Sequence, residues 1–248
     1  MSSLAMRPSA FSGIVTMTSR AAANRVTALA LVSALTLPVA AVAAQGSGEV
    51  ALVVKQNGRE IGRERFTLRD SRARDVAGSM LISTAHYPAT TPTLTLSATV
   101  ERTPEHALAK FQMDVDSSGS GTVILAAGSG TRLIVRTVAK GSEAGRELPG
   151  GPDVVLLDDA IFSLYVQVVD LASPSGSSLT AVFPRTGRRA AFTARREAAA
   201  GGNIRVVLGG GLSGTLVADA RGRLISLELP GSQIAVTRAD DGQPAPSR

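Results

Sequence analysis

The 248-residue chain has no cysteine and no tryptophan, and it has only two histidines and two tyrosines. Without cysteine there is no disulfide framework, no thiol nucleophile, no cysteine-ligated metal and no lipid anchor on an N-terminal cysteine. His86 and His106 are too few and too isolated to form a histidine metal cluster. We therefore expect no bound metal, no other cofactor and no catalytic residues.

The chain also lacks the strong positive charge that nucleic-acid binding requires. Three of the 26 basic residues, Arg7, Arg20 and Arg25, precede the mature part, which leaves 23 basic against 20 acidic residues. The basic residues come one at a time along expected strands, without a patch beside stacking aromatics. A nucleic-acid partner is therefore not expected.

Residues 1–44 have the pattern of a secretory signal peptide. Arg20 and Arg25 precede an apolar run over residues 26–39. This run contains Pro38 and is shorter than the roughly 20 apolar residues of a membrane span. We expect an exported protein, periplasmic or secreted, whose mature form does not span a membrane.

The apolar run leads into the small residues Ala40–Ala44, which allow cleavage after Ala43 or at the Ala44–Gln45 bond. The part before the apolar run is long for a leader. Translation from Met1 or from Met17 therefore both stay open.

Period-two alternation of apolar and polar residues dominates residues 45–238, which we interpret as one mainly antiparallel β domain. Asn57-Gly58 lies between two alternating runs and predicts a tight hairpin, because both positions must accept positive φ. Gly62 predicts a kink or a bulge in the second strand, since the alternation changes phase there. A Gly- and Pro-containing stretch, 141–153, divides the strands into two sets, and the polar tail 239–248 is expected to be disordered.

One segment, 158–171, breaks the alternation. Ile161, Leu164, Tyr165 and Val168 recur in it at helical spacing. Asp158 and Asp159 stand where a helix start favours a cap and negative charge. Because strands with one apolar face need a cover, we predict a strongly curved antiparallel sheet or half-barrel with this helix against its concave side.

Two glycine-rich motifs resemble nucleotide-binding loops. Residues 122–133 resemble the signature of sugar-phosphate nucleotidyltransferases, in which Gly128, Gly130, Thr131 and Arg132 would contact phosphate. Alternating runs flank Gly128-Ser-Gly130, however, which favours a hairpin turn. The Gly209–Gly214 run fits a dinucleotide-binding pattern, but a strand follows where that site needs a helix.

A hydrolytic site is not evident either. The chain has no G-x-S-x-G motif, and Ser83 and His86, three positions apart on an expected strand, point to opposite faces. An enzyme of the nucleotidyltransferase or hydrolase type is the third and last alternative.

Motifs at both ends of the mature chain carry a resemblance. Asp219-x-x-Gly-Arg223 forms a turn between two expected strands, Pro230 precedes a last strand ending in Arg238, and Asn57-Gly58 opens the domain. These features resemble a group of exported bacterial β proteins akin to the half-barrel of the periplasmic lipoprotein carrier (Lol-type). The resemblance implies an apolar concave cavity for an acyl chain or apolar peptide, and no catalytic residues.

We therefore predict a non-enzymatic extracytoplasmic binding or carrier module for an apolar ligand such as a lipid. The alternative is a structural or protein-interaction module of the cell envelope, with an envelope protein as partner and no small ligand. The residues expected to line the cavity are Phe162, Tyr165, Val166, Val169 and Phe183.

Overall fold

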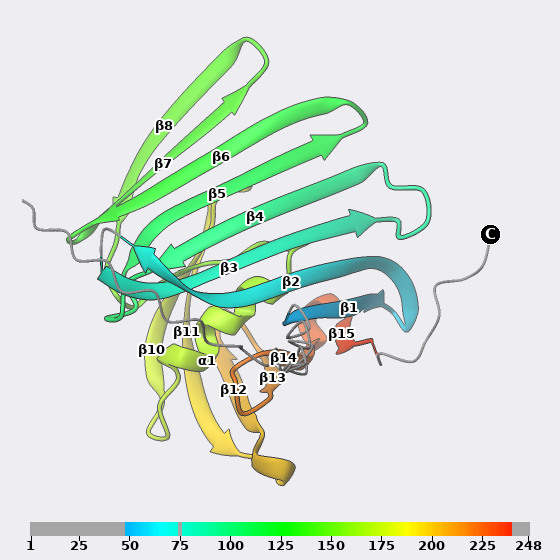
Figure 1. The fold of residues 1–248 in the computed structure, drawn as a ribbon, viewed down its shortest axis with the longest axis vertical. Coiled ribbons are helices and arrows are strands. Elements are labelled where there is room, and N and C mark those ends of the chain that lie inside the picture. The colour runs from blue at the N-terminus through cyan, green and yellow to red at the C-terminus, as the bar shows by residue number, and fades with distance from the viewer. Residues whose placement is uncertain (1–47, 74–75, 240–248) are drawn as a thin grey trace, which may run out of the picture. The chain divides into compact units, whose positions relative to one another are not determined.

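The structure is a computed structural model that describes residues 48–73 and 76–239 (Figure 1). The predicted leader 1–44 with its Ala44–Gln45 cleavage bond, and all but the first residue of the tail 239–248, lie outside the described residues. The described residues form fifteen strands, one α-helix and three short 3-10 turns, in the order β1(Glu49–Gln56), β2(Arg59–Ala73), β3(Val76–Tyr87), β4(Leu94–Arg102), β5(Leu108–Ser117), β6(Ser120–Ser129), β7(Arg132–Ala139), β8(Ser142–Pro149), β9(Val154–Leu156), η1(Ser163–Tyr165), α1(Val166–Leu171), β10(Ser177–Phe183), β11(Arg188–Ala198), η2(Ala200–Gly202), β12(Ile204–Gly210), β13(Gly214–Ala218), β14(Leu224–Leu229), η3(Pro230–Ser232) and β15(Ile234–Arg238).

All fifteen strands belong to one sheet, in the order β8 to β1, then β15 to β9. The chain starts in the middle of the sheet with β1, reaches one edge at β8, and resumes at the other edge with β9. It then returns to the middle, where β15 pairs with β1. Every pair is antiparallel except β9 with β10.

This strand order explains why the sheet curves. Strands lie about 4.8 Å apart, so a flat sheet of this width would separate β8 from β9 by roughly 65 Å. Only residues 150–153 join these two edge strands, a link that reaches no more than about 20 Å. The sheet must therefore curl until its edges approach each other, although it does not close into a barrel. The predicted mainly β, strongly curved fold is confirmed.

The predicted hairpin and bulge are both present in the β1–β2 pair. Asn57 and Gly58 have φ values of 52° and 75°, as the tight turn requires. The register shifts between Val54 and Lys55, so that Ile61 has no partner and Gly62 follows it. A Cβ on Gly62 would lie 2.8 Å from the carbonyl oxygen of His86, which leaves room for glycine alone.

Two sequence predictions are corrected. The helix begins at Ser163, not at residue 158, because Asp158 and Asp159 form ion pairs with arginines instead of capping it. The stretch 141–153, treated above as a divider between two sets of strands, contains the edge strand β8. All residues of β8 except Leu148 are exposed, so the strand has almost no apolar alternation to reveal it.

Candidate functional site

Residues 157–172, which we call the plug, cover the concave side of the sheet. They connect β9 to β10 and contain η1 and α1. α1 lies between strands β2–β4 and strands β10–β12 (Figure 1). Every residue from Ile161 to Val169 is buried, in a core cluster shared with both halves of the sheet. The plug therefore takes the place that an apolar ligand would occupy in an open half-barrel.

Glu64 on β2 holds the start of the helix. Its carboxylate accepts hydrogen bonds from the amides of Phe162 and Ser163, at 2.8 and 2.9 Å, and from Ser83 Oγ at 2.7 Å. The side chain is 1% exposed and has no cationic partner among the described residues. Burial raises the pKa of Glu64, and these hydrogen bonds offset part of that rise. A residue distant in sequence thus supplies the cap that the helix does not provide for itself.

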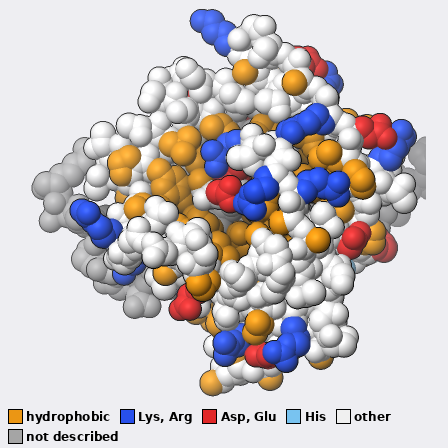
Figure 2. Space-filling model, turned by 180° about the vertical axis from the view of Figure 1, so that it is seen from behind, with side chains coloured by type: hydrophobic (Ala, Val, Ile, Leu, Met, Phe, Trp, Pro, Cys, Tyr) orange, Lys and Arg blue, Asp and Glu red, His pale blue; other side chains and the backbone are white. Residues whose placement is uncertain are grey.

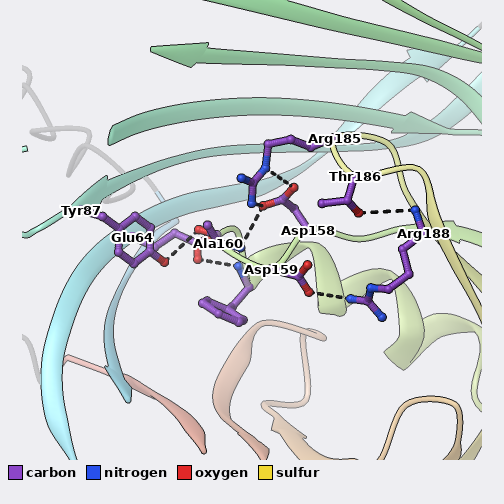
Figure 3. Close-up of polar contacts among 9 residues, drawn as sticks. Glu64, Tyr87, Asp158, Asp159, Ala160, Arg185, Thr186 and Arg188 are labelled. Atoms are coloured by element: carbon purple, nitrogen blue, oxygen red, sulfur yellow. Dashed lines mark hydrogen bonds and ion pairs between the residues drawn. The ribbon is translucent and has the colours of Figure 1, made fainter. Parts of the chain in front are cut away.

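The opposite side of the plug is held by an ion pair. Asp158 accepts two hydrogen bonds from Arg185, both 2.9 Å long, in a bidentate arrangement (Figure 3). Asp158 is buried, whereas the side chain of Arg185, in the β10–β11 turn, is 30% exposed. The same carboxylate accepts a hydrogen bond from the amide of Ala160 at 2.8 Å.

Tyr87 provides a third contact at this end of the plug. Its hydroxyl donates to the carbonyl oxygen of Ala160 at 2.8 Å (Figure 3). Burial raises the pKa of Tyr87, and the negative charges of Glu64 and Asp158 add to this effect while Arg185 opposes it. The hydroxyl therefore stays protonated and keeps its role as a donor.

Arg102 on β4 holds the helix itself. It is 4% exposed and donates to Gln167 Oε1 at 2.7 Å, to the Val154 carbonyl at 3.2 Å and to the His106 carbonyl. Gln167 in turn donates to the carbonyl of Leu156 at 3.0 Å. Burial lowers the pKa of Arg102 to about 10, against a weaker effect of Asp170. The guanidinium is thus charged at neutral pH with its donors directed at carbonyl and amide oxygens.

The five residues predicted to line a ligand cavity all lie in the packed core. Their exposed fractions are 1–2%, for Phe162, Tyr165, Val166, Val169 and Phe183. A packed arrangement arises because the plug side chains meet apolar side chains from both halves of the sheet. One of the five, Tyr165, also lines a polar cavity beside the plug. Binding of a ligand by these residues stays a prediction.

Both glycine-rich motifs are turns between antiparallel strands. Ser129 pairs with Arg132 across the β6–β7 turn, and Arg132 lies 3.6 Å from Glu147 of β8 in an ion pair. Gly209–Gly214 joins β12 to β13, so a strand follows it as predicted. Ser83 and His86 have separate partners, Glu64 and Thr95, and do not form a catalytic pair.

The Asp219-x-x-Gly-Arg223 motif and Arg238 have a structural role. Asp219 accepts hydrogen bonds from the amides of Arg221 and Arg223, and Arg238 Nη2 donates to it at 3.1 Å. Arg238 also donates to the carbonyl of Leu224. Burial disfavours the charged carboxylate, but the hydrogen bonds together lower the pKa of Asp219. The spacing of Asp, Gly and Arg in this motif therefore serves to join β13, β14 and β15.

Charged side chains of both signs lie among hydrophobic ones on the face seen from behind (Figure 2). Within residues 48–73 and 76–239, no group of three or more acidic or histidine side chains could hold a metal ion. No helix of this part of the chain is long and apolar enough to cross a membrane.

Comparison with known proteins gives only distant structural likenesses. No protein-family model and no curated protein matches the sequence. A DUF1089 family protein from Pseudomonas aeruginosa is similar over 68% of this chain and 90% of its own, with a TM-score of 0.44 and 16% identity. A β-barrel-like protein of the domain of unknown function DUF1849 from Brucella abortus is similar over 77% of this chain and 96% of its own, with a TM-score of 0.45 and 9% identity. The resemblance to the lipoprotein carrier stays an expectation.

Proposed function

We propose that the chain is an exported, non-enzymatic binding module of the cell envelope that works with its half-barrel closed and meets its partner at the surface. The observation that carries this proposal is the plug, whose apolar side chains between Ile161 and Val169 fill the concave side and are 0–2% exposed. The apolar run and small residues before Gln45 support export.

The apolar space left near the β9 edge of the sheet is small, which supports a closed interior. An apolar cavity lined by Leu108, Leu133 and Val154 has a volume of about 100 Å³. Pockets for drug-sized ligands have about 300–1,000 Å³. An acyl chain would therefore need the plug to move.

The polar contacts of the plug oppose that movement. Opening would separate Glu64 from two backbone amides, Arg102 from Gln167 and Asp158 from Arg185. Each buried group left without a partner costs about 1–3 kcal/mol. The same contacts use the hydrogen-bonding capacity of the buried ionisable groups, which supports a structural and not a catalytic role for them.

The carrier function is the second candidate, and one observation favours it. The plug is a single continuous segment, and its apolar side chains cover apolar strand positions on both halves of the sheet. Displacing one segment would therefore uncover a continuous apolar surface of the kind that holds an acyl chain.

Titration with a fluorescent fatty acid separates the two candidates. We expect no saturable binding to the folded mature protein, since the concave side is filled. Saturable binding that weakens in Tyr165→Asp, with the circular dichroism unchanged, would establish the carrier instead. The control is Ile134→Asp, which places the same charge at a position that is 42% exposed on β7.

A further inference from the structure

A small polar cavity lies beside the plug. It has a volume of about 230 Å³ and is lined by Asp159, Tyr165 and Arg188, together with the β12–β13 turn and the η3 turn. The β12–β13 turn is the glycine-rich motif that the fold does not use for a nucleotide. The cavity is thus built from the plug, from β11 and from two turns of the C-terminal half.

The glycine-rich turn is held in one position by its backbone. The amide of Gly211 donates to the carbonyl oxygen of Ala191 on β11 at 2.9 Å. A Cβ on Gly211 would lie 2.7 Å from the same oxygen, so a larger residue would push the turn away. The exposed Ser213 follows and adds a hydroxyl to the lining.

The charged pair in the cavity is also fixed. Arg188 Nη2 lies 2.6 Å from Asp159 Oδ1, in an ion pair visible in Figure 3. The guanidinium carbon lies 3.4 Å from the centre of the Phe183 ring, which orients the arginine further. One oxygen of Asp159 and the remaining N–H groups of Arg188 stay available to a ligand, since the described residues give them no other partner.

Tyr165 is the observation that points to a ligand. Its side chain is 98% buried, yet its hydroxyl makes no hydrogen bond with any of the described residues. Tyr165 lines the same cavity as Asp159 and Arg188. Burial raises the pKa of Tyr165, the charge of Asp159 adds to the rise and that of Arg188 opposes it. The hydroxyl faces the cavity and no described residue satisfies it, so a bound hydroxyl compound could exchange a hydrogen bond with it.

We propose that this cavity binds a single neutral sugar residue. A sugar hydroxyl both donates and accepts, so it can donate to Asp159, accept from Arg188 and do either with Tyr165. The two charges of the ion pair cancel each other. Asp159 would repel an anion and Arg188 would repel a cation, so the cavity favours a neutral ligand. The volume is below the range of drug-sized ligands, which limits the occupant to one ring.

The inference rests on the proposed function in that it gives the surface module a ligand class. The test is isothermal titration of the mature protein with glucose, galactose and N-acetylglucosamine, and with acetate and inorganic phosphate as charged probes. We expect saturable binding of at least one neutral sugar. Tyr165→Phe should weaken it about three- to tenfold, the effect of one lost hydrogen bond.

The matched control is Tyr87→Phe, which removes the other phenolic hydroxyl that touches the plug without altering the cavity lining. Its affinity for the sugar should equal that of the wild type. Absence of sugar binding, binding of the charged probes alone, or equal affinity in Tyr165→Phe would each overturn the inference. The proposed function fails separately, through saturable fatty-acid binding to the wild type.

Discussion

The two sides of the plug are held by carboxylates in opposite circumstances. Glu64, on the β2 side, is buried with backbone amides and a hydroxyl as its partners and with no cation. Asp158, on the β10–β11 side, is buried too, but it is paired with the guanidinium of Arg185, whose side chain is 30% exposed. One side of the plug therefore depends on a desolvated carboxylate that water cannot replace, whereas the other side keeps a partner that water can reach.

The largest effect is expected for Glu64→Ala. The substitution leaves two buried amides of the plug without an acceptor, at about 1–3 kcal/mol each, so the free energy of unfolding should fall by about 3 kcal/mol or more. Urea denaturation followed by circular dichroism measures it. Glu60→Ala, which removes an exposed ion pair with Arg63 on the same strand, is the control and should change the stability by less than about 1 kcal/mol. Equal effects of the two substitutions would refute the assigned role of Glu64.

Asp158→Asn should cost less, about 1–3 kcal/mol. The amide oxygen can keep the bond to the backbone of Ala160, and Arg185 can be hydrated once it is released. The same denaturation experiment measures the change. Asp159→Asn is the neighbouring control, since Asp159 and Arg188 are both about half exposed. If Asp158→Asn destabilises the protein more than Glu64→Ala does, the ion pair with Arg185 stabilises the plug more than the Glu64 contacts do.

The contacts that hold the plug cannot be predicted from the sequence, because they join residues that are far apart along the chain. The strand pattern, the Asn57-Gly58 turn and the bulge at Gly62 are local, so alternation and positive φ predict them. Glu64 and Phe162 are 98 residues apart, and nothing in either neighbourhood indicates their contact. The pattern predicts a local cap at Asp158 and Asp159 because it cannot show that Arg185, in a later turn, and Arg188, on β11, pair with them. The five predicted lining residues lie in the packed core, and periodicity does not distinguish a packed surface from an open one.

The pH dependence of stability should separate Glu64 from a carboxylate with the opposite shift. Because burial raises the pKa of Glu64 above its usual 4.5, the folded state holds the proton more tightly, and stability falls as the pH rises from 4.5 through the folded pKa. Hydrogen bonds lower the pKa of Asp219 below its usual 3.8, so its contribution is present above that pH and is lost as the pH falls through the folded pKa.

Urea denaturation of variants between pH 3 and pH 8 checks both signs. Glu64→Gln should flatten the decline in the free energy of unfolding above pH 4.5. Asp219→Asn should flatten the loss of that free energy below pH 3.8. A Glu64→Gln curve parallel to that of the wild type above pH 4.5 would show that burial of Glu64 does not shift its proton affinity.

The smallest effect is expected from the two tyrosines, since one hydroxyl belongs to the plug and the other bonds to it. Tyr87 donates to the carbonyl of Ala160, so Tyr87→Phe should lower the free energy of unfolding by about 0.5–1.5 kcal/mol. Tyr165 has no partner among the described residues, so Tyr165→Phe should change it by less than about 0.5 kcal/mol or raise it. Both substitutions keep the ring and its packing, and the same urea titration compares them directly. A loss in Tyr165→Phe as large as that in Tyr87→Phe would mean that its hydroxyl bonds within the protein, and the cavity would then lose the free hydroxyl on which the sugar site depends.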